Sequence, residues 1–288
     1  MIEVLLSGFF FAMIYASIAL GLSLIFGVMK ILNIAQGEFY MLGGFVSLFL
    51  MVTFGLDFWL SLLATPIIVG LIAIIFERGL RRFYGEEPLY GLIMTLAYSL
   101  LLRDLAYSVS RMIEIGPVSV GAGFFAIDIP VTGAFSFLGA TISYYRIIAS
   151  AIIIVFYLFL WYLIKRTKVG IIIRAAAQNS ELLGCHGINV RTVYMSTFCL
   201  SAAMAGLAGV LMGPITSIYS DMGHDIILLA FIYVLIGGLG NIRGTILATI
   251  IFAQMFVILS QYLTPYWSQT ILAVIALFVL FYTSRRRY

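Results

Sequence analysis

The chain has 288 residues, of which 63% are hydrophobic and only 10% are charged, and its formal net charge is +4. A soluble domain carries about 25% charged residues, so this composition excludes an ordinary water-soluble protein. The positive charge does not indicate nucleic-acid binding, because the cations lie between apolar segments instead of clustering. These apolar segments are continuous and longer than barrel strands, which predicts membrane-spanning helices.

A spanning helix needs about 20 mainly apolar residues. The uncharged segments cover residues 4–29, 39–56, 58–76, 88–102, 147–164, 192–220, 226–242 and 244–284. Pro265 divides the last segment into two, and the short fourth segment is expected to continue past Arg103 and Asp104. The sequence therefore predicts one all-α domain over residues 1–288, a bundle of about nine transmembrane helices.

The distribution of cations predicts how the bundle is oriented. All Lys and Arg residues except Arg103, Arg111 and Arg146 fall in connections on one side. Because cytoplasmic connections are enriched in cations, we expect the N-terminus outside and the C-terminus inside. The long outer connection, 110–145, is expected to hold short extended pieces around a turn at 124–133. The long inner connection covers residues 165–191.

A polar run follows the first apolar segment and contains Asn33, Gln36, Gly37 and Glu38. Asn33 and Gln36 are three residues apart, so on a helix they share a face. An ionisable group near hydrocarbon faces a cavity or a partner, and a glycine permits a helix break, which makes this run a candidate translocation path. The alternative is a helix start at the cytoplasmic interface, with Asn33 as its cap. The pattern leaves both interpretations open.

The inner connection is basic at its edges and helix-forming in its centre. Gly170 and Gly187 bracket a predicted amphipathic helix that contains Arg174, Ala175 and Glu181. A short helix across the inner face would suit the docking of a soluble partner. The alternative is a helix that rests on lipid headgroups.

Small residues predict close packing in two places. They are Ser201, Ala205, Gly209 and Gly213, spaced by four, and Gly237, Gly238 and Gly240 in a turn. The turn lacks the Lys of a phosphate-binding loop, so this chain is not expected to hydrolyse ATP alone. Neither G-x-S-x-G nor H-E-x-x-H occurs, and the two Cys lack metal-ligand spacing. We therefore expect no enzymatic activity, no metal and no cofactor in this chain.

Several motifs together resemble the permease subunits of bacterial branched-chain amino-acid ABC importers of the LivH type. They are GLSLIFGV at 21–28, LNIAQGEF at 32–39, Gly170 with Arg174 and Ala175, GINV at 187–190, AGLAGVL at 205–211 and GGLG at 237–240. The resemblance covers roughly residues 4–255 and implies a multi-pass protein of the bacterial inner membrane. It implies that the inner connection docks an ATPase subunit, and that ATP and Mg²⁺ are bound by two such subunits. It also implies a second homologous permease and an external solute-binding protein.

Departures from the family pattern bear on the solute. Many relatives carry His at the position of Gln36, and residues common in relatives are replaced by Asn179, Leu182, Leu183 and Leu229. The resemblance implies inward transport of branched-chain or other apolar amino acids, while related permeases serve urea, short amides or other amino acids. An alternative from a different class is a secondary transporter or channel, which should carry ion-coupling acids deep in several spans.

Overall fold

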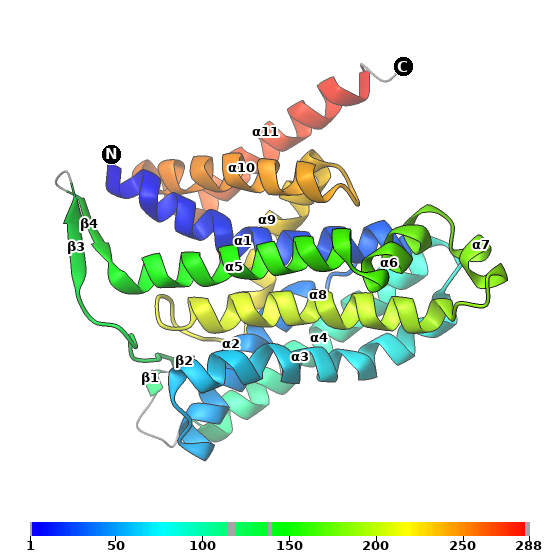
Figure 1. Ribbon diagram of the computed structural model, residues 1–288. Helices are drawn as coiled ribbons and strands as arrows, with labels where there is room; N and C mark the ends of the chain where they lie inside the picture. The colour runs from blue at the N-terminus through cyan, green and yellow to red at the C-terminus, as the bar shows by residue number, and fades with distance from the viewer. Residues whose placement is uncertain (1, 114–118, 122, 138–139, 286–288) are drawn as a thin grey trace.

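The computed structural model describes residues 2–113, 119–121, 123–137 and 140–285, and the chain is mainly helical (Figure 1). Each of the predicted apolar segments corresponds to a helix. These helices are α1 (Ile2–Met29), α2 (Gln36–Phe54), α3 (Phe58–Leu80), α4 (Pro88–Ile113), α5 (Tyr144–Arg166), α8 (Val190–Met212), α9 (Met222–Gly237), α10 (Ile242–Tyr262) and α11 (Pro265–Arg285). The chain is an all-α polytopic membrane protein.

Two expectations about helix ends are confirmed. α4 continues past Arg103 to Ile113, and Pro265 begins α11, at the first helical position, where the missing N–H has no partner in the helix to lose. Among the described residues, α1, α2, α3, α4, α5, α8 and α10 are long and apolar enough to cross a membrane. α9 is shorter, so the count of about nine crossings stays a prediction.

The long connections lie at opposite ends of the bundle (Figure 1). The N-terminus lies at the end that carries the hairpin of β3 (Ala134–Phe137) and β4 (Ala140–Ser143). The other end carries α6 (Lys168–Gln178) and α7 (Ser180–Cys185), and the described C-terminal end of α11 also lies toward it. This placement agrees with the predicted topology, although its inside–outside direction stays a prediction. Arg286 and Arg287, which contribute to that prediction, lie outside the described residues.

The outer connection contains extended pieces, but they form two pairs and not one turn at 124–133. β1 (Ser119–Gly121) pairs with β2 (Phe124–Phe125), and β3 pairs with β4, both antiparallel. The backbone of Phe125 also exchanges two hydrogen bonds with Ile218, of 2.9 and 2.7 Å. This bridge holds the outer connection against the link between α8 and α9. Strand pairing needs partners that lie apart along the chain, which the local pattern does not specify.

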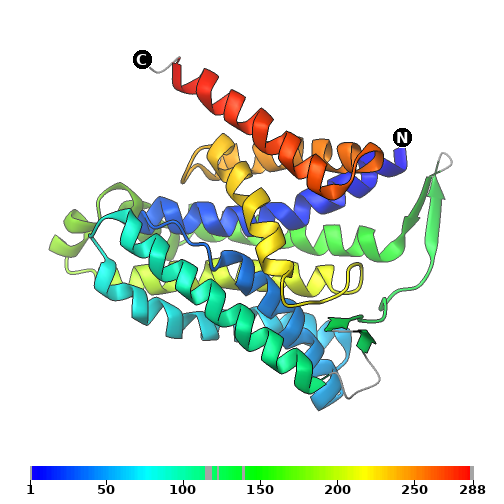
Figure 2. The ribbon, with the colours of Figure 1, turned by 180° about the vertical axis from the view of Figure 1, so that it is seen from behind.

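α1 and α8 form the centre of the bundle. In an 18-residue stretch of each, 78% of the α1 residues and 72% of the α8 residues are buried, against 22% in α5. The outward face of α5 presents large apolar side chains such as Val155 and Leu158, as a lipid-facing surface should. α9 crosses these helices steeply and lies in front of α1 when the molecule is seen from behind (Figure 2). The polar run at residues 33–38 lies where α2 and α9 pack against α1 and α8.

The orientation can be tested with cysteines at the two ends. Cys185 is exposed on α7, and Thr132 is exposed in the outer connection. After Cys199→Ala, a membrane-impermeant maleimide should label Cys185 in inside-out vesicles but not in intact cells. A Thr132→Cys, Cys185→Ser variant should label from the outside. The reverse pattern would show that the N-terminus is inside.

Candidate functional site

The chain between α1 and α2 is a break in which the backbone leaves helical geometry. Lys30 has a positive φ of 57°, and α2 begins only at Gln36. The intervening backbone lies along α4, where Thr95 Oγ1 donates to Leu32 O at 3.0 Å and accepts from Ile34 N at 3.2 Å. Backbone groups freed by a helix break must find partners inside a membrane protein. Thr95 supplies them.

Gln36 places the start of α2 deep in the bundle. Its Nε2 donates to Ser201 O at 3.0 Å, and Ser201 Oγ donates to Gln36 Oε1 at 3.1 Å. Ser201 lies halfway along α8 (Val190–Met212). Asn33 Nδ2 also donates to Gln36 Oε1, at 3.3 Å. These side chains are fully buried, so the polar run lies half a helix length from either end of α8.

The alternative of a capped helix start at the membrane surface does not hold. The N-cap residue of α2 is Ala35, without a side-chain cap, while the Asn33 side chain bonds to Gln36. The depth of Ser201 excludes a surface position. The depth of Gln36 is set by tertiary contacts, because a pair of hydrogen bonds joins it to a residue 165 positions away in the chain.

Glu38 is the buried carboxylate of this region and is only 1% exposed. Its Oε1 accepts a hydrogen bond from Ser99 Oγ at 2.9 Å. Its Oε2, like Oδ1 of Asn33, has no hydrogen-bond partner among the described residues. We call Asn33, Gln36, Glu38, Ser99 and Ser201 the buried polar cluster. Both unpartnered atoms are acceptors, so the cluster has more acceptors than its donors can satisfy.

The start of α9 closes one side of the cluster. A Cβ at Gly37 would collide with Gly223 O, and a Cβ at Gly223 would lie 2.7 Å from Glu38 Oε2. Only glycines allow the two helix starts to cross at this distance. Beside the crossing, Arg103 Nε and Asp221 Oδ1 form an ion pair at 2.6 Å that joins α4 to the residue before α9.

A cavity of about 360 Å³ lies on the other side of this crossing. Its walls come from α1, α2, α9, α10 and α11 and include Tyr15, Tyr40, Phe256 and Asp225. Tyr219, in the link before α9, donates to Asp225 Oδ2 at 2.7 Å. Burial and this hydrogen bond raise the pKa of the Tyr219 hydroxyl above its usual value of 10.0. It therefore stays protonated at neutral pH and keeps donating to Asp225.

The small residues of α8 lie where other segments approach closely. A Cβ at Gly209 would collide with Tyr40 O, so α2 lies directly on this face. Ala205 is fully buried. Gly213 differs from the expected helix contact, because its nearest neighbours are Ile127 and Ile218, in the connections at the outer end of the predicted topology.

The glycine turn joins α9 to α10, as predicted. Gly238 and Gly240 have positive φ values of 92° and 79°, which L-residues with side chains rarely adopt. A Cβ at Gly240 would lie 2.9 Å from Gly27 Cα, and a Cβ at Gly237 would collide with the backbone N of Thr245 in α10. The turn is therefore packed tightly against α1 and the start of α10.

The predicted inner helix is in fact two helices. Asn179 has an extended backbone conformation that ends α6, and its Oδ1 accepts from Leu182 N at 3.0 Å to cap α7. The expectation of one helix bracketed by glycines is therefore wrong. Gly170 lies inside α6, and only Gly187, with φ 76°, follows the helical part. An Asn can cap a new helix more readily than it continues one.

The residues predicted for partner docking divide into two groups. Gly170 faces the bundle, since a Cβ there would collide with Ile164 O. Arg174 is exposed, but its guanidinium donates to the same carbonyl. Ala175 is half-buried. Glu181 and Gly187 are exposed. The surface available to a soluble partner therefore includes α7, while the guanidinium of Arg174 is also engaged in holding α6 to the end of α5.

Sequence reasoning missed three features of the site. Thr95 and Ser99 were not singled out, although both are hydroxyl residues four apart in an apolar helix, a spacing that places them on one face. Ser201 was assigned to packing alone. The tyrosine cavity was also missed, because Tyr15, Tyr40 and Asp225 are remote in the chain and only the fold brings them together.

The fold and this buried polar cluster describe a membrane transport protein, and the comparisons with known proteins identify its family. Residues 4–280 match the model of the branched-chain amino acid transport system / permease component family. The chain belongs to this family, which consists of transport subunits and not enzymes. No solved structure matches the chain significantly.

Three relatives illustrate the similarity. The probable branched-chain amino acid transport permease protein LivH of Methanocaldococcus jannaschii is 27% identical over 88% of this chain and 80% of its own length. LivH of Escherichia coli K12 is 26% identical over 92% of this chain and 88% of its own length. LivM of the same organism, also described as a high-affinity branched-chain amino acid transport system permease protein, is 24% identical over 83% of this chain and 60% of its own length.

The contact between α2 and α8 should not tolerate even one methyl group. Gly209→Ala places a Cβ against Tyr40 O, so we expect it to destabilise the fold by about 1–3 kcal/mol through overpacking. Thermal unfolding of the purified protein in detergent measures this. Gly184→Ala is the matched control, because its Cβ would lie 3.8 Å from Val190 Cγ2. Equal melting temperatures for both variants would contradict this packing.

Proposed function

We propose that the chain is a permease subunit of an ATP-binding-cassette importer that moves branched-chain or other apolar amino acids into the cell. ATP and Mg²⁺ would be bound by two separate cytoplasmic ATPase subunits. A second homologous permease and an external solute-binding protein would complete the assembly in the bacterial inner membrane. The main support is membership of the permease family across residues 4–280.

The buried polar cluster supports a role in the translocation path. Asn33 Oδ1 and Glu38 Oε2 are buried acceptors without donors among the described residues, an arrangement that costs about 1–3 kcal/mol for each unsatisfied group. A solute that brings N–H donors, such as the ammonium group of an amino acid, would satisfy them. The surrounding helices supply apolar walls for its side chain.

Passage through this cluster requires a conformational change. Gln36 and Asn33 are fully buried, and the crossing of Gly37 with Gly223 closes the side next to the tyrosine cavity. The state described by the structure is therefore closed at the cluster. Movement of α9 relative to α2 would open a connection from the cavity to Glu38, and alternating access driven by ATP supplies such a movement in this proposal.

The inner end offers a surface for an ATPase subunit. Leu182 on α7 is 59% exposed, beside the exposed Glu181. An apolar groove of about 390 Å³ lies nearby, between α6 and the start of α8, with Ile172 and Ile188 in its walls. An exposed apolar residue next to an apolar groove suits a protein partner better than water.

The alternatives differ in driving force and solute. A secondary transporter should hold several unpaired acids in its spans. Among the described residues the buried acids are Glu38 and Glu77, and Glu77 is already neutralised by Arg81 at 2.9 Å. Urea or short amides remain a solute alternative, since they also carry N–H donors.

Reconstitution of the complete importer in proteoliposomes tests this function. We expect leucine uptake that requires ATP, both permeases and the binding protein. Uptake by this chain alone, driven by an ion gradient, would show that it is a secondary transporter. ATP-driven uptake of urea or an amide without uptake of leucine would show that the solute assignment is wrong.

The path is tested by Glu38→Gln, which keeps the shape of the side chain and can retain the Ser99 hydrogen bond. It replaces one carboxylate oxygen by a donor, so an ammonium group would lose its acceptor. We expect leucine uptake to fall at least tenfold, with normal assembly of the complex. Glu86→Gln, which changes an exposed carboxylate, is the matched control. Normal uptake by Glu38→Gln would show that the cluster is structural.

The inner surface is tested by Leu182→Glu. A charge on this exposed apolar side chain should prevent its burial by the ATPase, so we expect loss of ATPase co-purification and of ATP-driven uptake while membrane insertion is normal. Leu239→Glu, on the turn between α9 and α10, serves as the control, since Leu239 is also partly exposed. Retained co-purification of Leu182→Glu would place the ATPase contact elsewhere.

A further inference from the structure

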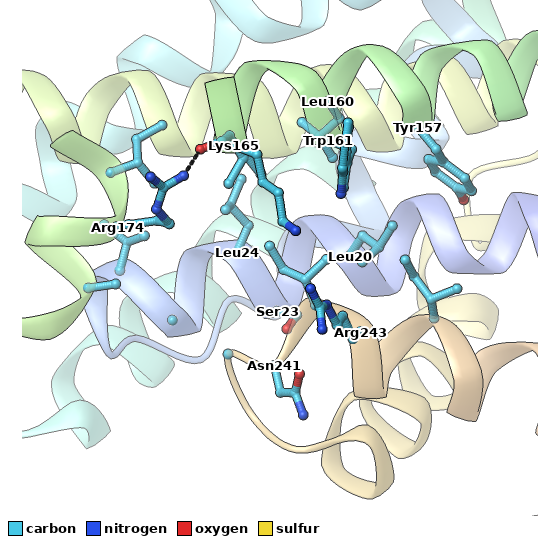
Figure 3. A pocket seen from close by; sticks show the side chains of 18 residues that line it. Leu20, Ser23, Leu24, Tyr157, Leu160, Trp161, Lys165, Arg174, Asn241 and Arg243 are labelled. Atoms are coloured by element: carbon cyan, nitrogen blue, oxygen red, sulfur yellow. Dashed lines mark hydrogen bonds between the residues drawn. The ribbon is translucent and has the colours of Figure 1, made fainter. Parts of the chain in front are cut away.

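A cleft of about 360 Å³ opens between α1, α5, α6 and α10 (Figure 3). Its walls are mainly apolar and include Leu20 and Leu24 of α1 and Leu160 of α5. The cleft lies at the end of α5 where α6 begins, which is the inner end in the predicted topology. It is separate from the buried polar cluster and from the tyrosine cavity, because none of its lining residues belongs to either.

Three cations border this apolar cleft, and no acidic residue lines it in the described part of the chain. They are Lys165, Arg174 and Arg243. In Figure 3 the side chains of Lys165 and Arg243 extend from α5 and α10 toward the same region. Two like charges that converge without a counter-charge repel each other, so this arrangement favours binding of an anion.

The contacts of these cations leave hydrogen-bonding capacity for a ligand. Arg174 uses a guanidinium N–H to hold Ile164 O. Lys165 Nζ lies 5.2 Å from the centre of the Trp161 ring, a contact that leaves its three N–H donors free to bind an acceptor. An anion between Lys165 and Arg243 would therefore receive charge-assisted hydrogen bonds from both sides of the cleft.

The start of α10 adds to this positive potential. Asn241 is the N-cap residue of α10 and also lines the cleft. Its Oδ1 accepts from Gly244 N at 3.2 Å, which satisfies one of the first N–H groups of the helix. The remaining N–H groups and the helix dipole favour negative charge at this position.

The walls indicate that the anion carries hydrocarbon. A free inorganic anion would have no use for the apolar surface of the partly exposed Ile242 and Ile246, which line the cleft on α10, whereas an acyl chain would cover it. Trp161 is 52% exposed beside Lys165 near the end of a membrane-spanning helix, and Trp at such positions is typical of the membrane interface. Basic pockets between helices on the cytoplasmic side bind anionic headgroups.

We propose that this cleft binds one anionic phospholipid, with its phosphate between Lys165 and Arg243 and an acyl chain along α1. The lipid would connect α5 and α10, which lie on α1 on the two sides of the cleft. Because the cleft also includes Arg174 and Ala177 of α6, occupation would support the position of α6 at the inner end. This proposal does not depend on which solute the protein transports.

Native mass spectrometry of the full-length protein in mild detergent tests the proposal. We expect phosphatidylglycerol to bind at one site at least tenfold more tightly than phosphatidylcholine of the same chain length. Lys165→Gln with Arg243→Gln should remove this preference. Lys165→Arg with Arg243→Lys should retain it, because both positive charges persist. Arg166→Gln with Arg82→Gln is the matched control, since both residues are exposed and neither lines the cleft.

Three results would overturn the proposal. Equal affinity for the two lipids would show that the cations do not select an anion. Equal loss of preference in the control variant would show that overall charge, and not the cleft, attracts the lipid. Displacement of phosphatidylglycerol by an equal concentration of glycerol phosphate would identify a site for a soluble anion, in which the apolar walls contribute no affinity.

Discussion

The structure depends on one constraint, which is that the backbone between α1 and α2 must be hydrogen-bonded where water is scarce. Thr95 meets this requirement by bonding both Leu32 O and Ile34 N. Because these groups are satisfied, α1 can end and α2 can begin halfway along α8. That depth is what brings Gln36 to Ser201 and Glu38 to Ser99. A continuous helix would have carried these side chains elsewhere.

Glycines at the helix contacts complete the arrangement, because their lack of a side chain lets the helices approach closely around the polar groups. Gly37 and Gly223 let α2 cross α9, while Gly209 lets α2 lie on α8. Close approach also buries Glu38 Oε2, which has no donor among the residues that the structure describes. The same packing that stabilises the bundle therefore creates the unsatisfied acceptors on which the proposed path depends.

The inner end separates three tasks among neighbouring residues. Arg174 and Gly170 attach α6 to the end of α5, α7 exposes Leu182 on the surface proposed for the ATPase, and Lys165 with Arg243 borders the cleft proposed for a lipid. Because Arg174 holds Ile164 O, its substitution would disturb the α5–α6 junction before it affected any ATPase. Exposed residues of α7 therefore report on docking more directly than the motif residues that resemble the family pattern.

The sequence by itself determined the fold class, the helices and the division at Pro265, because hydropathy and proline geometry are local properties. In lipid, backbone groups must be hydrogen-bonded within the protein, so a long apolar segment is sufficient to predict a helix. Its motifs also indicated the family. Only the tertiary structure decided the depth of Gln36, the bond of Arg174 to Ile164 O and the convergence of Lys165 with Arg243. The polar run at 33–38 was compatible with both a surface helix start and a buried break. Contacts such as that of Gln36 with Ser201 join residues 165 positions apart, and they depend on how whole helices pack, which no local pattern encodes.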